Sequence, residues 1–343
     1  MKRFKIITML VLILMTVSVG AVYLFKTLDT TKGLTCSQVN CIRKDSRGYM
    51  WFGTPAGLYR YDGYTFKNFQ CDPQDGSSLP DSYINSIQEG MDGELWVETS
   101  TGYCIYHPQS ESFERDTKAA FAKMGINTTP TLVFIDKHKN LWAYTPNKGV
   151  DCYNMQQQLL YNFGYTDNST GIPQGNIVAM CESQEGTILA YDNGRIVCCD
   201  VMHQQHTLWS NQTLADRGMK PNKYLKVFCD SRDNIWLYGS GTLLLYNKNI
   251  SKWDTEIGSR LGFLGLGTDK SVNGMSEDKN GNLWIATDRD GLLKMNVYSY
   301  EVENVEPESM NTNAKIAGSV KIQSVYVDDT NLLWVGTQKY GVA

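Results

Sequence analysis

Charged residues are scarce in this chain of 343 residues, where Asp, Glu, Lys and Arg together make up 20%. The 32 basic and 36 acidic side chains leave a formal net charge of −4. This balance argues against a nucleic-acid-binding protein, because such a protein usually carries a basic stripe. Apolar residues make up 42%, enough for a sizeable core, which excludes a disordered chain. The 30 glycines, 20 tyrosines and 8 tryptophans favour β-structure.

The chain also lacks the common signatures of catalytic and cofactor sites. It has no P-loop, no dinucleotide-binding fingerprint and no Gly-x-Ser-x-Gly elbow. His107 and His138 are isolated. His203 and His206 lie three residues apart in the predicted strand region 201–209, where they would point to opposite faces and could not share a metal ion. We therefore expect no catalytic residue, no cofactor and no metal site.

Nine cysteines are present, and their number is odd. They form no C-x-x-C pair and show neither the spacing of a zinc site nor that of a regular disulfide framework. We expect most of them to be small buried hydrophobic residues in strands. An occasional disulfide is compatible with an oxidising compartment, and the pairing is left open.

The N-terminus has the pattern of an export signal. Lys2, Arg3 and Lys5 precede an apolar run from Ile6 to about Leu24, with small residues suited to cleavage after Gly20 or Ala21. The sequence predicts a signal peptide over residues 1–21. The alternative is an uncleaved anchor helix, because the run approaches the ~20 residues that span a bilayer. In either case we expect residues 22–343 to be exported, to the periplasm if the source is bacterial.

A segment of about 47 residues repeats along the rest of the chain. In most copies a β-branched run ends in Asp, a Gly or Asn follows two or three residues later, and a strand of the Leu-Trp-Val type comes next. A Gly then begins a third strand, and aromatic residues mark a fourth. The repeat tryptophan recurs in six copies, with Leu189 in its place in the fourth copy: Trp51, Trp96, Trp142, Trp236, Trp284 and Trp334.

The period is close to that of one four-stranded propeller blade. The Asp can accept hydrogen bonds from its own downstream backbone, and a glycine such as Gly48, Gly93 or Gly281 can adopt a positive φ, so the pair predicts a tight turn. The Trp can fill the wedge between neighbouring sheets. The sequence therefore predicts an all-β fold, a seven-bladed β-propeller of four-stranded blades over residues 22–343. Residues 23–28 are expected to add an outer strand to the last blade.

These patterns resemble a known repeat family. The stretches that carry the resemblance are the Asp-x-x-Gly turns, Leu333-Trp334-Val335-Gly336-Thr337, and an opening that runs from Phe25 through Gly33-Leu34 and Gly53-Thr54 to Tyr61-Asp62-Gly63. The repeat resembles the two-component regulator propeller repeat. The opening is similar to the mature N-terminus of the hybrid two-component sensors of Bacteroidetes.

The resemblance implies a periplasmic sensor domain. In that family two such propellers and a β-sandwich precede a membrane helix, and a histidine kinase, a receiver and a helix-turn-helix domain follow it. Many members sense oligosaccharides released by glycan breakdown. This chain has no kinase phospho-acceptor region and no ATP-binding glycine boxes, so we interpret it as an N-terminal fragment or truncated product without kinase activity of its own. The implied partners are an oligosaccharide and a second copy that dimerises through further periplasmic domains.

One face of the predicted propeller is the candidate ligand face. The innermost strand of each blade comes first in the chain, so the links from second to third strand and the links between blades emerge together on that face. The links between blades are long: residues 70–82, 118–129, 165–175, 255–271 and 306–319. Tyr83, Asn147, Arg289 and Lys339 offer a stacking plane and hydrogen-bond donors for a sugar or an acidic partner. The alternative is that these loops only cover the ring or pack on a second propeller.

An enzyme of propeller architecture would need paired carboxylates or a histidine at the channel mouth. The recurring acids instead occupy the turn position of the repeat: Asp45, Asp136, Asp230, Asp278 and Asp328. We therefore predict a sensory propeller that binds a ligand or mediates dimerisation. The alternative left open is a free-standing secreted carbohydrate-binding or scaffold propeller.

Overall fold

The computed structural model describes residues 23–90, 93–165, 171–254, 257, 270–305, 308–309 and 321–343. The predicted signal segment lies outside the described residues, as do parts of the long loops 165–175, 255–271 and 306–319. Within the described ranges, no helix is both long enough and apolar enough to cross a membrane.

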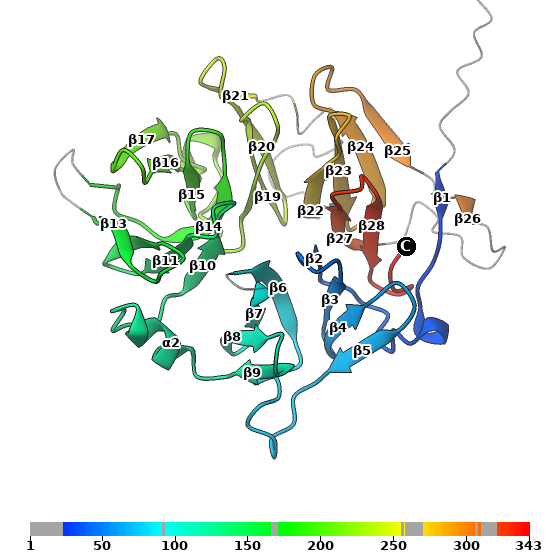
Figure 1. Ribbon diagram of the computed structural model, residues 1–343. Helices are drawn as coiled ribbons and strands as arrows, with labels where there is room; N and C mark the ends of the chain where they lie inside the picture. The colour runs from blue at the N-terminus through cyan, green and yellow to red at the C-terminus, as the bar shows by residue number, and fades with distance from the viewer. Residues whose placement is uncertain are drawn as a thin grey trace, which may run out of the picture.

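Antiparallel four-stranded sheets stand around a central channel as the blades of a propeller (Figure 1). In every blade the strands pair in chain order, from the innermost strand to the outermost. The first three blades are β2 (Cys41–Lys44), β3 (Met50–Thr54), β4 (Gly57–Tyr61) and β5 (Phe66–Phe69); β6 (Ile84–Glu89), β7 (Leu95–Thr99), β8 (Gly102–His107) and β9 (Ser112–Glu114); and β10 (Leu132–Ile135), β11 (Leu141–Thr145), β12 (Gly149–Tyr153) and β13 (Leu159–Phe163).

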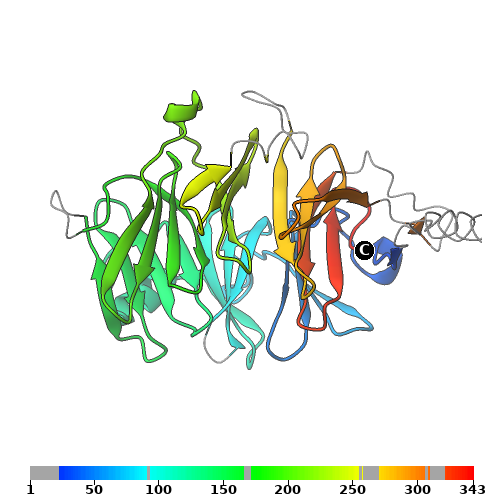
Figure 2. The same ribbon diagram turned by 90° about the horizontal axis from the view of Figure 1, so that it is seen from above.

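The next three blades have the same order. They are β14 (Ile177–Glu182), β15 (Thr187–Tyr191), β16 (Ile196–Asp200) and β17 (Gln205–Ser210); β18 (Lys226–Cys229), β19 (Ile235–Gly239), β20 (Thr242–Asn247) and β21 (Lys252–Asp254); and β22 (Val272–Glu277), β23 (Asn282–Thr287), β24 (Leu292–Asn296) and β25 (Val302–Val305). The described helices are short: η1 (Thr30–Lys32), α2 (Thr117–Lys123) and η3 (Ala215–Arg217). The edge view in Figure 2 shows the blades side by side.

The prediction of seven four-stranded blades is wrong. Six blades have four strands, whereas the seventh copy of the repeat forms a two-stranded sheet of β27 (Ile322–Val327) and β28 (Leu333–Thr337). Along the outer edge of β28, Ala343 exchanges two backbone hydrogen bonds with Val335, of 2.7 and 2.9 Å. The prediction was wrong because the strong signals of the repeat, the Asp turn and the Trp strand, indicate only the first two strands of a copy. They say little about the third and fourth.

The N-terminal segment does not form the expected outer strand of that sheet. β1 (Leu24–Phe25) pairs in parallel with β26 (Glu308–Ser309), which follows the sixth blade (Figure 1). Further along, Leu28 and Val342 exchange backbone hydrogen bonds of 2.7 and 3.0 Å. Residues from the two ends of the described chain are therefore joined, but by an isolated bridge and not by a full strand.

The turn between the first two strands contains a residue with a positive φ in every copy. The residue three positions before the repeat Trp or Leu189 has a positive φ in all seven: Gly48, Gly93, Lys139, Gly186, Asp233, Gly281 and Asn331. Glycine at four of these positions avoids the steric penalty of a left-handed backbone. The backbone geometry thus repeats even where the side chain does not.

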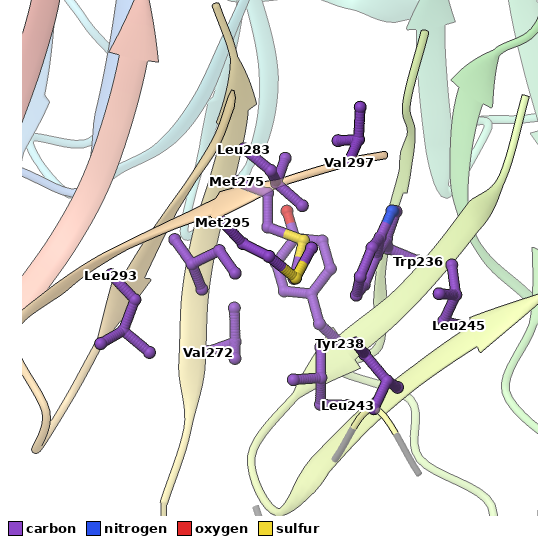
Figure 3. Close-up of a cluster of buried hydrophobic side chains, with 12 residues drawn as sticks. Trp236, Tyr238, Leu243, Leu245, Val272, Met275, Leu283, Leu293, Met295 and Val297 are labelled. Carbon is purple, nitrogen blue, oxygen red and sulfur yellow. The ribbon is translucent and has the colours of Figure 1, made fainter. Parts of the chain in front are cut away.

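The core lies between blades. Trp51, Trp96, Trp142 and Trp236 are at most 1% exposed, and Trp284 is 5% exposed. Figure 3 shows one interblade cluster, in which Trp236 of β19 faces Met275 of β22 and the side chains of β23 and β24. Trp334, on the two-stranded sheet, is only half-buried and borders a cavity of about 600 Å³. The missing outer strands therefore leave that tryptophan less covered than its counterparts.

All nine cysteines lie in the described part of the chain and are free thiols. Cys104, Cys152, Cys198 and Cys199 are buried, and the other five are half-buried. Burial raises the pKa of the thiols of Cys104 and Cys198 to about 12. These thiols are thus packed mainly as apolar side chains.

Candidate functional site

The central channel is a candidate binding site at the centre of the ring of blades. It has a volume of about 630 Å³ and is lined by residues of the first strands of all six blades and of β27. Pockets of this size hold small molecules in many proteins. The channel lining is mixed: aromatic, aliphatic and amide side chains predominate, with few charges.

The mouth of the channel opens on the face predicted from the sequence to hold the long loops. Each first strand begins there, beside the turn between the second and third strands of its own blade. The Ser100 N–H, for example, donates a hydrogen bond of 3.1 Å to the carbonyl of Tyr83, and the Gln338 N–H donates one of 3.0 Å to the carbonyl of Lys321. The opposite face carries the tight Asp turns.

The structure brings one of the four predicted ligand residues to the channel. Tyr83, 41% exposed, lines the channel just before β6. Asn147, Arg289 and Lys339 are exposed in the turns after β11, β23 and β28, and none of them lines the channel. Asn147 has a φ of 65°, so its backbone shapes the turn. The four residues therefore share a face but do not form one cluster.

Two of the predicted long loops are packed as covering segments. Arg115 donates hydrogen bonds to the carbonyls of Asp72 (2.8 Å) and Leu79 (3.0 Å), which fixes the loop of residues 70–82. The loop of residues 118–129 contains most of α2, and its Phe121 packs against Trp96 with ring centroids 5.5 Å apart. These two loops match the alternative stated above, in which the loops cover the ring.

Four channel residues were missed by the sequence analysis. Lys223 and Tyr224 precede β18, Lys226 begins it, and Glu98 comes from β7. Glu98 did have a signal in the sequence, because it stands where Leu-Trp-Val-Gly-Thr of the seventh copy has Gly336. Nothing in the local pattern of the other three residues sets them apart, since lining a channel is a property of the closed ring.

Lys226 and Glu98 are charged groups without an ion-pair partner in the described structure. The Lys226 ammonium donates a hydrogen bond of 2.8 Å to the carbonyl of Asn273 in the next blade. The Ser86 hydroxyl donates one of 2.8 Å to the carboxylate of Glu98. Lys226 lies on the channel wall, and its side chain is exposed to solvent there.

Burial shifts the pKa of Lys226 and that of Glu98 in the direction that favours the neutral form of each group. It lowers the pKa of Lys226, and the charges of Cys41 and Glu98 only partly oppose this. It raises the pKa of Glu98, against a hydrogen bond from Ser86 and the charge of Lys226. Burial also raises the pKa of the Cys41 thiol to about 12. The surrounding protein therefore favours the neutral form of each group, and a ligand group of opposite charge or a hydrogen-bond partner would favour the charged form.

The histidines show no arrangement of metal ligands. His203 pairs with Asp200 in the turn before β17, at 2.5 Å, while His206 lies within β17. His203 therefore does not share a strand with His206, contrary to the sequence interpretation. Across the described residues, no group of three or more His, Cys, Asp or Glu side chains is placed to hold a metal ion.

Comparison with known proteins identifies the repeat. The two-component regulator propeller family matches residues 33–56 and 265–289. Two segments of this chain are therefore similar to the two-component regulator propeller repeat. The first match covers the turn of the first copy with Gly48 and Trp51, and the second contains the sixth-copy turn with Gly281 and Trp284.

Solved structures with the same fold include extracellular domains of two-component systems. The extracellular domain of the hybrid two-component system BT3049 from B. thetaiotaomicron superposes with a TM-score of 0.64 at 19% identity, over 93% of this chain and 41% of the other. The corresponding domain of the hybrid two-component system BT4673 superposes with a TM-score of 0.65 at 19% identity, over 93% of this chain and 39% of the other. The chain thus spans about two fifths of the length of these domains.

Two further likenesses are more limited. A histidine kinase P4 of Formosa agariphila is 39% identical over 57 residues, which are 17% of this chain and 4% of that protein. A streptogramin B lyase has a TM-score of 0.54 at 11% identity, over 92% of this chain and 94% of the lyase. Because an enzyme shares the propeller fold, the fold alone does not decide between a sensor and a catalyst.

Proposed function

We propose that this chain is the ligand-sensing propeller of a two-component signal-transduction protein. The observation that carries the proposal is the repeat itself, which matches the two-component regulator propeller family in the first and sixth copies. The likeness to extracellular domains of hybrid two-component systems supports it. The same comparisons favour a sensor over a free-standing scaffold or carbohydrate-binding propeller. Kinase activity would belong to other domains of such a protein.

An extracytoplasmic location is part of the proposal. The basic and apolar N-terminal segment has the order of an export signal, and the similar solved domains are extracellular. N-terminal sequencing of the exported protein tests this point, with Ala21 or Val22 as the expected first residue. A retained Met1 in the membrane fraction would instead support the anchor.

We place ligand recognition at the channel mouth, with a glycan-derived oligosaccharide as the ligand. A cavity of about 630 Å³ with Tyr83 and Tyr224 at its rim supports ligand binding over dimerisation as the role of this face. Aromatic rings provide flat apolar area together with a polar hydroxyl. Polar side chains at the same rim, such as Asn85 and Asn273, supply donors and acceptors.

A catalytic role is disfavoured by the chemistry of the channel. Glycoside hydrolysis ordinarily needs two carboxyl groups. Glu98 is the one carboxylate among the described residues that line the channel, and no histidine lines it within that part of the chain. We therefore propose binding without turnover.

Calorimetry of the full chain with a panel of glycan oligosaccharides tests the proposed function. At least one oligosaccharide should bind, and its binding should weaken in Tyr83→Ala at an unchanged melting temperature. Product analysis after long incubation should show no cleavage. If no oligosaccharide binds, glycan sensing by this propeller is wrong.

A further inference from the structure

We propose that the channel mouth binds a sugar acid, with its carboxylate on Lys226 and its hydroxyl groups on Glu98. The inference rests on the proposed ligand-sensing function and adds the chemical class of the ligand. It is based on Lys226 and Glu98, which line the same cavity and have no ion-pair partner among the described residues.

Lys226 supplies the anion-binding group. An ammonium has three N–H donors, and one of them is used on the Asn273 carbonyl at 2.8 Å. No carboxylate in the described ranges forms an ion pair with Lys226, which is exposed on the channel wall. Lys223 lies at the same mouth, where its ammonium stands 5.0 Å from the ring centroid of Tyr224. A ligand anion would meet two cations of the protein there.

Glu98 supplies an acceptor for ligand hydroxyls. Its carboxylate accepts one hydrogen bond, from the Ser86 hydroxyl, and has no cation at ion-pair distance among the described residues. A carboxylate can accept about four hydrogen bonds. Glu98 and Lys226 line the same cavity, so one ligand that fills it can contact both groups. A simple anion would satisfy only Lys226, whereas a polyhydroxylated acid satisfies both.

The shape of the site fits a ring-bearing ligand. Tyr83 and Tyr224 line the cavity and are 41% and 72% exposed, so both rings are accessible to a ligand. A volume of about 630 Å³ exceeds what a single carboxylate or phosphate ion requires. Rings for stacking, a cation and a hydroxyl acceptor together describe a uronic-acid saccharide of about two units.

The test uses calorimetry of the full chain with three uronic-acid disaccharides: digalacturonate, dimannuronate and cellobiuronate. Galactobiose, mannobiose and cellobiose are the neutral partners. At least one acid should bind about tenfold or more tightly than its neutral partner, since hydrogen bonds to charged groups are the stronger ones. The affinity should fall as salt is raised, because salt screens the ion pair.

Variants assign the effect to the two groups. Lys226→Met keeps the stem and removes the charge, and it should weaken acid binding at least about tenfold. Lys226→Arg should retain most of the binding. Lys339→Met is the matched control, because Lys339 is an exposed lysine on the same face that does not line the channel. Glu98→Gln should weaken both acidic and neutral sugars. Melting temperatures verify that each variant is folded.

The outcomes separate this inference from the proposed function. If neutral sugars bind as tightly as acids, or if folded Lys226→Met binds the acids like the unmodified chain, the inference is wrong while sugar sensing stands. If no sugar of either class binds, both are wrong. Acid-selective binding that is lost in Lys226→Met and kept in Lys339→Met supports both.

Discussion

The indole Nε1–H of Trp236 donates a hydrogen bond of 3.0 Å to the carboxylate of Asp230, six residues earlier. The same pair recurs at the same spacing in four other copies: Asp45 with Trp51, Asp136 with Trp142, Asp278 with Trp284, and Asp328 with Trp334. The Asp that shapes the turn therefore also fixes the indole that packs between blades. Local turn and interblade core are stabilised by one carboxylate.

The carboxylate of Asp230 should be essential for stability. It also accepts the backbone N–H groups of Arg232 and Asn234, at 3.0 and 2.9 Å, and is itself only 3% exposed. Asp230→Ala leaves these donors unpaired, and we expect it to cost about 3–4 kcal/mol in urea unfolding. Asp329→Ala removes an exposed carboxylate and should have little effect. Equal stability of the two variants would contradict the role given to Asp230.

The tryptophans should differ in their contribution to stability. Trp284→Ala empties a nearly fully buried site and should cost about 3–5 kcal/mol. Trp334→Ala should cost clearly less, because Trp334 is only half-buried beside the two-stranded sheet. Chemical unfolding of both variants measures the difference. A cost below about 1 kcal/mol for Trp284→Ala would mean that this side chain is not a wedge between blades.

Acid should destabilise the protein through the turn carboxylates. At Asp278 and Asp328 burial favours a higher pKa, but hydrogen bonds from the turn and from the tryptophan outweigh it, so the pKa of each group is lowered. The unfolded carboxylates, with pKa values near ~3.9, therefore take up protons first as the pH falls.

It follows that this stabilisation is complete above about pH 5 and is lost as the pH falls through ~4 toward the folded pKa values. Urea unfolding between pH 6 and pH 2.5 should show the loss. The Asp278→Asn variant should be less stable than the unmodified protein at pH 6. Its free energy of unfolding should also fall less on acidification. If the free energy of unfolding of this variant falls with pH as steeply as that of the unmodified protein, Asp278 does not contribute to the acid sensitivity.

The bridge between the two ends of the described chain should stabilise the ring. Leu28 is 6% exposed and packs in one cluster with Leu34 and Val342, in addition to its backbone pairing. Leu28→Ala should cost about 2–4 kcal/mol. Deleting residues 23–28 should lower the melting temperature further, because the backbone pair is then lost as well. A deletion variant that melts like the full chain would show that the bridge is dispensable.

Buried thiols should resist alkylation in the folded protein. The raised pKa of Cys104 and Cys198, about 12 in each case, leaves little thiolate at pH 8. Iodoacetamide labelling read by mass spectrometry should be slow at both positions and fast in urea. Rapid labelling of Cys104 without denaturant would mean that the second blade opens readily.

The residues that line the channel could be predicted from the sequence only in part. Tyr83 was found because it precedes a first strand on the loop face, and the ring does bring it to the channel. Asn147, Arg289 and Lys339 were chosen because they lie in the links between second and third strands on the same face, and none of them lines the channel. Lys226 and Glu98 come from the fifth and second blades, and nothing local in the chain indicates that they share a cavity.

The sequence by itself determined the repeat unit: an Asp, a left-handed residue and a Trp at fixed spacing, which fold locally because each turn satisfies its own backbone donors. It also predicted an all-β propeller, since each sheet must bury its aromatic face against another. Only the tertiary structure decided that six copies become four-stranded blades and the seventh a two-stranded sheet. The outer strand of each four-stranded blade pairs with the strand just before it in the chain, whereas the bridge between Leu28 and Val342 joins segments far apart in the chain. The same long-range closure decided which charges meet inside the channel.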